Sequence, residues 1–162
     1  VSAVNNEDYA TFVDWGEKCS LGSWQTLSRK EFDYILSSRA DASKKNAHAT
    51  VAGIHGIVLL PEGWILPEGC TFTPGLISSL GFATNEYSAS QWQSMEAAGA
   101  VFLPAAGHRN QQTTISITYE GSYNTSTAAG AGQNYILYFT SGDLRTKLHN
   151  SCNGFSVRLA HE

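Results

Sequence analysis

The sequence contains little that would support a metal, redox or membrane function. Its three cysteines (Cys19, Cys70 and Cys152) lack the close pairing of a zinc site, and their odd number leaves at least one thiol outside any disulfide. The five histidines are scattered along the chain. The apolar run 56–60 is far too short to cross a bilayer. We therefore expect no metal, no other cofactor and no direct insertion into a membrane.

Positive charge is also scarce. Ten Lys and Arg residues stand against fourteen Asp and Glu, which gives a formal net charge of -4. Nucleic-acid-binding proteins usually concentrate Lys and Arg, so we expect no nucleic-acid partner. What the chain does have is 42% apolar residues, including seven Tyr, seven Phe and four Trp, which is enough to build a core. We expect one domain that spans residues 1–162.

Two capping boxes mark the clearest helices. Ser28 and Glu31 form the first, and the apolar residues that follow at i, i+3 and i+4 spacing predict a helix to about Ser38. Ser88 begins the second helix, and Gly99 is placed to end it in a left-handed conformation.

Strand signals surround and follow these helices. Residues 41–50 are polar and predict a loop. Apolar runs and alternating segments predict strands at 50–54, 56–60, 101–104, 113–118, 134–139 and 154–159. Helices interleaved with strands, followed by an all-β final third, are typical of an α+β domain, here with mostly antiparallel short strands.

Four blocks of sequence, in order along the chain, resemble one known family. They are 24–32 (Trp-Gln-Thr-Leu-Ser…Glu-Phe), 56–64 (Gly-Ile-Val-Leu-Leu-Pro-Glu-Gly-Trp), 95–107 (Met-Glu-Ala-Ala-Gly-Ala-Val-Phe-Leu-Pro-Ala-Ala-Gly) and 154–159 (Gly-Phe-Ser-Val-Arg-Leu). Similar blocks occur in C-type-lectin-like domains of gut bacterial surface proteins. The same fold and ending occur in variable proteins of diversity-generating retroelements, such as phage tropism determinants. The chain departs from the family's pattern at Asn124, where Trp is usual, and at Ser151, where Arg is frequent.

The resemblance implies a C-type-lectin-like fold and a binding function. In these systems the adenines of a template copy are mutated, so Asn codons become codons for other residues on a ligand-facing surface. We therefore expect a ligand-binding display protein with its variable region at about 110–153. Its partner would be a protein or glycan of unknown identity. The protein would act at a cell surface, extracellularly or on a phage virion. Display in several copies would compensate for weak binding at a single site.

The candidate binding residues come from strand alternation and from codon chemistry. Alternation in 134–139 predicts that Tyr135, Leu137 and Phe139 are buried and that the residues between them point outward. From 143 to 153 the candidates are residue types that can arise by changing adenines in an Asn codon, whereas Lys147 and Gln133 cannot. Tyr123 and Tyr138 would serve as aromatic anchors, and Tyr138 and Arg145 are the first hot-spot candidates. The full candidate face is Ser116, Thr118, Ser122, Tyr123, Asn124, Asn134, Ile136, Tyr138, Asp143, Arg145, Leu148, His149, Cys152 and Asn153.

Other interpretations stay open. The final third could be an ordinary polar loop and hairpin, in a non-diversified adhesive or structural domain of a bacterial surface protein. The fold is shared with formylglycine-generating sulfatase activators, but these need a cysteine pair or metal-binding cysteines in the C-terminal half, where only Cys152 lies. We expect no enzymatic activity. For the pair His108 and Arg109 we expect a surface or hydrogen-bonded structural role, because the sequence places no carboxylate or nucleophile beside it.

Overall fold

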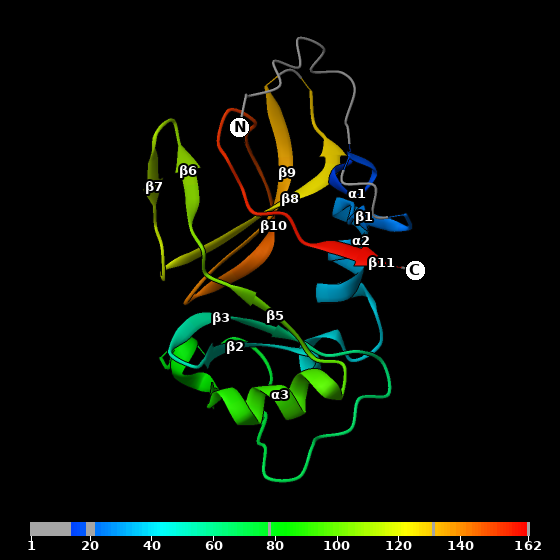
Figure 1. Ribbon diagram of the computed structural model, residues 1–162, viewed down its shortest axis with the longest axis vertical. Coiled ribbons are helices and arrows are strands. Elements are labelled where there is room, and N and C mark those ends of the chain that lie inside the picture. Colours follow the sequence, from blue (N-terminus) through cyan, green and yellow to red (C-terminus); the bar gives the residue numbers. More distant parts are fainter. Residues whose placement is uncertain (1–13, 19–21, 78, 131, 162) are drawn as a thin grey trace.

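A computed structural model describes residues 14–18, 22–77, 79–130 and 132–161 (Figure 1). Within these ranges the chain is an α+β structure of short helices and mostly antiparallel strands, as the sequence predicted. No helix in the described ranges is both long and apolar enough to cross a membrane. Cys19 lies outside these ranges. Cys70 is buried and Cys152 exposed, and the two do not form a disulfide with each other.

The elements follow the order helix, strand, helix and then mainly strand. The described helices are α1 (Trp15–Lys18), α2 (Arg29–Asp33), the π-helix η1 (Tyr34–Ser38), the 3₁₀ turns η2 (Ala42–Lys44) and η3 (Gly81–Thr84), and α3 (Ala89–Ala97). The described strands are β1 (Trp24–Thr26), β2 (Asn46–Val51), β3 (Ile54–Leu59), β4 (Glu86–Tyr87), β5 (Val101–Pro104), β6 (His108–Asn110), β7 (Thr113–Ile115), β8 (Glu120–Ala128), β9 (Gln133–Thr140), β10 (Asp143–Asn150) and β11 (Leu159–His161).

Both predicted helix starts are confirmed. The Ser28 hydroxyl accepts from the amide of Glu31, and the Glu31 carboxylate accepts from the amide of Ser28 at 2.6 Å. The helix reaches Ser38 as predicted, but its last part is wound as the π-helix η1. Ser88 caps α3 in the same way, and Gly99 follows that helix with φ +94°. Local side-chain chemistry alone therefore determines where both helices begin.

The first sheet has the order β4-β2-β3-β5 and corrects two strand boundaries. The predicted strands at 50–54 and 56–60 are β2 and β3, which begin earlier and turn at Ala52 and Gly53. The prediction of a loop over 41–50 is wrong for its second half. That stretch is polar, but Asn46 is buried because its side-chain amide donates to the Ala42 carbonyl at 2.7 Å. A polar residue with a buried partner looks like a loop residue in the sequence.

The remaining strands form three smaller sheets, of which β10-β9-β8 is the largest. The strand predicted at 113–118 is shorter than expected, because β7 ends before Ser116 and Thr118, which take φ of +59° and +70°. It is not half-buried either: β7 pairs only with β6, and all of its residues are exposed. The closing strand predicted at 154–159 is also shifted. Only β11 is regular there, and it pairs with β1.

The core joins the two larger sheets. Phe32 of α2 packs with Leu59 of β3 and with Leu137 and Phe139 of β9 in one buried cluster. Alternate residues of β3 point to the opposite side of its sheet, where a second cluster includes Met95 of α3. Figure 1 accordingly shows α3 on the side of β2 and β3 that faces away from β8, β9 and β10. The three-stranded sheet therefore has one side packed in the core.

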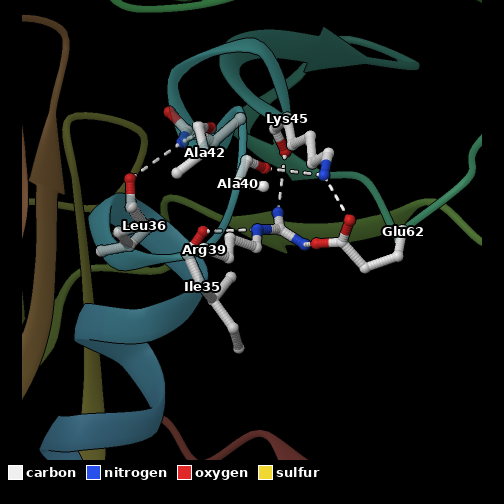
Figure 2. A network of polar contacts seen from close by, with 8 residues as sticks. Ile35, Leu36, Arg39, Ala40, Ala42, Lys45 and Glu62 are labelled. Carbon is white, nitrogen blue, oxygen red and sulfur yellow. Dashed lines mark hydrogen bonds and ion pairs between the residues drawn. The ribbon is translucent and has the colours of Figure 1, made fainter.

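A polar network fixes the helix end to the first sheet (Figure 2). The Arg39 side chain is 7% exposed; its Nε donates to the Ile35 carbonyl at 2.8 Å, and its guanidinium also contacts Glu62 at 3.7 Å. Lys45 Nζ donates to the Ala40 carbonyl at 2.8 Å and pairs with the same carboxylate. Because these groups come from the C-terminal end of η1, the residue before β2 and the loop after β3, the network sets the position of the helix against the sheet.

His48 is the least satisfied polar side chain of the first sheet. It is fully buried in β2, its ring meets Phe82 edge-on at 5.1 Å, and neither ring nitrogen has a hydrogen-bond partner among the described residues. Burial lowers the pKa of His48 below its ordinary 6.5, although the backbone at Thr140 and Asp143 acts in the opposite direction. The folded protein therefore holds the neutral imidazole.

Acidification is expected to destabilise the protein through His48. The unfolded chain binds a proton on this ring near pH 6.5, whereas the folded chain does so only at lower pH. The free energy of unfolding should therefore fall as the pH drops through the unfolded value and level off below the folded one. Urea titrations between pH 5 and 8 measure this dependence. The variant His48→Leu, which cannot titrate at this site, should show a shallower dependence; an unchanged slope would contradict the assignment.

Candidate ligand-binding face

The strand register of β8, β9 and β10 divides their side chains between two sides. Tyr138 lies opposite Ser122 on β8 and opposite Arg145 on β10, and His149 lies opposite Asn134. Directly opposed residues in an antiparallel pair share a side of the sheet. We call the side away from the core the outward face. By register it consists of Glu120, Ser122, Asn124, Ala128, Asn134, Ile136, Tyr138, Thr140, Asp143, Arg145, Lys147 and His149.

Two candidate residues lie on the other side. Tyr123 is 4% exposed, stacks on Phe139 with ring centroids 6.2 Å apart, and donates its hydroxyl to the Pro104 carbonyl at 2.7 Å. Burial raises the pKa of this phenol well above its ordinary range. The prediction that Tyr123 is a binding anchor is therefore wrong. Leu148 alternates with His149 and also points away from the outward face, although it is 45% exposed.

Two residues of the outward face do not reach solvent. Ile136 is fully buried, which corrects the prediction that it is exposed. It lies in the central strand with Asn124 and Lys147 directly opposite, and side chains of this length can lie over a central neighbour. Ser122 is also fully buried and donates its hydroxyl to Glu120 at 2.7 Å. Both side chains therefore lie below the solvent-accessible surface of this face.

Charged groups hold Tyr138 in place at the middle of the face. Lys147 Nζ lies 3.1 Å from the centroid of the Tyr138 ring, a cation–π geometry. Burial, and then the charges of Glu120 and Asp143, raise the pKa of Tyr138. Arg145, the most open cation of the face, pairs with Asp143 at 3.0 Å. The half-buried phenol is thus oriented before any ligand arrives, which lowers the entropy cost of using it in binding.

One end of the face is held by amide and imidazole groups. Asn134 donates its side-chain amide to the side-chain carbonyl of Asn124. His149 lies next to Asn153, their side-chain nitrogens 3.3 Å apart. Burial, and then the charge of Lys147, lower the pKa of His149. Asn153 therefore borders the face, although it lies beyond β10.

The other candidates lie at the periphery. Ser116 and Thr118 are in the turn between β7 and β8, where the amide of Thr118 donates to the Ala105 carbonyl at 2.8 Å. Cys152 is exposed in the turn after β10. The candidates that the structure brings together with access to solvent are Asn124, Asn134, Tyr138, Asp143, Arg145, His149 and Asn153.

Three hydrogen-bonded polar side chains at the edge of the face, His108, Glu120 and Ser122, were not predicted from the sequence to lie together. His108 Nδ1 lies 2.8 Å from the Glu120 carboxylate, and that same oxygen accepts from Ser122. His108 is thus hydrogen-bonded, as expected, but to a carboxylate twelve residues away that sequence reasoning did not place beside it. The rings of His149 and Phe155 adjoin it at 5.7 and 5.8 Å. The alternation of Glu120 and Ser122 in β8 was the available signal.

Comparisons with known proteins give no family for the chain. No family model matches it, and no solved structure matches it. The chain is similar to "L-lactate dehydrogenase 2" of Bacillus cereus and of Bacillus anthracis, with 36% identity over 64 residues in each case. That similarity covers 36% of this chain and only 20% of each dehydrogenase. Such a partial likeness assigns neither membership of that family nor its activity.

Proposed function

We propose that this chain is a ligand-binding display domain with a C-type-lectin-like fold, whose outward face is varied by retroelement mutagenesis. The observation that carries the proposal is the strand register, which gives Asn124, Asn134, Tyr138, Arg145 and His149 one common face. The other side of the same strands is packed in the core. A varied surface needs this combination, because its side chains can change without loss of the frame.

The resemblance to C-type-lectin-like domains supports the same division of roles. Its first three blocks supply frame residues, among them Phe32 of α2, Ile57 of β3, Met95 of α3 and Leu103 of β5, all of which are buried. The solvent-reaching residues of the outward face come instead from β8, β9 and β10. The proposed target is a protein or glycan on another cell or particle, and the domain itself acts at a cell surface, extracellularly or on a phage virion.

Sequence variation among sibling copies of the gene tests the proposal. We expect substitutions to concentrate at Asn124, Asn134, Tyr138, Arg145 and His149, because these positions reach solvent and carry residue types that Asn codons yield when their adenines change. Deep sequencing of the coding DNA across a population measures the distribution. The neighbouring DNA should carry a reverse transcriptase and a template repeat rich in Asn codons.

Lys147 provides the internal control. It shares the face with the varied residues, but adenine changes in an Asn codon cannot produce a lysine codon. Under the proposal Lys147 stays fixed, together with the buried Leu137 and Phe139. If Lys147 varied as much as its neighbours, ordinary surface drift would explain the pattern. An unvaried face without a reverse transcriptase nearby would instead favour the fixed adhesive domain.

A further inference from the structure

A concave site borders the outward face where β6 meets the segment that follows β10. Its volume is about 330 Å³, and its walls include Gly107, His108, Arg109 and Phe155. The two walls are joined by backbone hydrogen bonds, since the amide of Arg109 donates to the Gly154 carbonyl at 2.7 Å and the reverse bond is 2.8 Å. The site is therefore formed before a ligand arrives. Its volume is in the range that takes one side chain or a small molecule.

The hydrogen bond of His108 to Glu120 sets what the site can bind. Its Nδ1 faces the Glu120 carboxylate, which only accepts hydrogen bonds, so Nδ1 carries the proton. The Ser122 hydroxyl bonds the same carboxylate and holds it in place. In the neutral ring Nε2 is then an acceptor. Among the described residues Nε2 has no hydrogen-bond partner, and His108 lines the site although its side chain is only 9% exposed.

Aromatic and cationic groups surround this acceptor. The Phe155 ring lies 5.8 Å from His108 and meets His149 edge-on at 5.0 Å. Arg109 is exposed, and its Nε donates to the Gln111 carbonyl at 2.9 Å, which anchors the guanidinium at the rim. An aromatic ring is the group that can pack against Phe155 and also interact with a guanidinium through its face.

We propose that this site, the His108 pocket, binds the phenol side chain of a tyrosine on a protein ligand. The phenol hydroxyl donates to His108 Nε2 while the ring lies between Phe155 and Arg109. A carboxylate cannot make this hydrogen bond, because it has no proton to donate to Nε2. The inference rests on the proposed function and deepens it: His149 belongs to the outward face and adjoins both His108 and Phe155, so the pocket continues that face.

Small-molecule probes test the pocket without knowledge of the natural ligand. N-acetyl-L-tyrosinamide, titrated into the whole chain at pH 7.5, should shift the NMR signals of the His108 ring nitrogens and of the Gly107 and Arg109 amides. A ligand of this size in an open site should saturate at roughly millimolar concentration. N-acetyl-L-phenylalaninamide lacks only the hydroxyl and should bind about 5-fold more weakly, the effect of one hydrogen bond.

Two variants and a control make the result specific. His108→Phe should remove the preference for the tyrosine probe over the phenylalanine probe, because it removes the acceptor but keeps a ring. Phe155→Leu should weaken both probes. Lys44→Ala, which removes an exposed cation in η2 outside the outward face and the pocket, should leave the affinity of both unchanged. Thermal unfolding of each variant establishes that it is folded.

The contrary outcomes are distinct. Equal binding of the two probes would overturn the hydrogen bond to Nε2, and shifts from methyl α-D-glucoside without shifts from the tyrosine probe would make the pocket a sugar site. No shift from any probe would overturn the pocket altogether. None of these results depends on sibling sequences. A fixed outward face with tyrosine-dependent shifts would refute diversification alone, and a varied face without shifts would refute the pocket alone.

Discussion

Truncation of Tyr123 to alanine is expected to lower the free energy of unfolding by about 3–5 kcal/mol, as for other large core aromatic residues. The side chain is buried against Phe139, and its hydroxyl bonds the Pro104 carbonyl, so the change leaves both a cavity and an unpaired carbonyl. Urea denaturation followed by circular dichroism measures the loss. Tyr123→Phe separates the two contributions, since it removes only the hydrogen bond and should cost about 1–2 kcal/mol.

Tyr138→Ala is the matched control, because it truncates the same residue type on the outward face of the neighbouring strand. Tyr138 is half-buried and is in contact with Lys147, so its loss should cost only about 1 kcal/mol. The difference between the two losses in the free energy of unfolding measures how much more the core depends on its tyrosine than the outward face does. Equal losses would mean that the outward face is part of the core and cannot vary freely.

Gly121→Ala should also destabilise the protein strongly, by about 3 kcal/mol, at the upper end of the usual cost of overpacking. Gly121 lies directly opposite Phe139 in the sheet, and a Cβ at this position would overlap the Phe139 ring. Neither the strand nor the fully buried ring can move without disturbing the core. Thermal or urea unfolding measures the effect.

Gly142→Ala is the control for this substitution. Gly142 lies in the turn between β9 and β10, where a Cβ would meet no atom within 4 Å, so a change within about 0.5 kcal/mol is expected. The double variant Gly121→Ala/Phe139→Leu should be less destabilised than the sum of its single changes, because a leucine leaves room for the added methyl. Strict additivity would show that the ring is not what excludes a side chain at position 121.

Local signals predicted the parts of the fold that depend on local contacts. The capping boxes at Ser28 and Ser88 are made within one helical turn, so both helix starts could be derived from the sequence. Alternation in 134–139 likewise predicted the burial of Leu137 and Phe139. The same alternation, applied to β8, would have placed Tyr123 inward, because Ser122 and Asn124 on either side of it point outward.

Contacts between distant segments account for what the sequence did not reveal. His48 is a polar residue in a buried strand, and the Phe82 ring that it packs against comes from η3, far along the chain. Ile136 alternates outward as expected but is fully buried in the central strand between β8 and β10. The pairing of His108 with Glu120 depends on the path of the chain between β6 and β8. Each case required knowledge of which strands become neighbours.

The pairing of β1 with β11 determines how the domain responds to a pulling force. Trp24, where the chain enters the pair, lies opposite His161, where it leaves, and the other end of the ribbon is closed by Thr26 and Leu159. Tension applied through the chain on both sides of this pair would break the hydrogen bonds between β1 and β11 one after another, starting at Trp24 and His161, rather than all at once. In single-molecule stretching this ribbon should open first, at low force, while the sheet that carries the outward face stays intact.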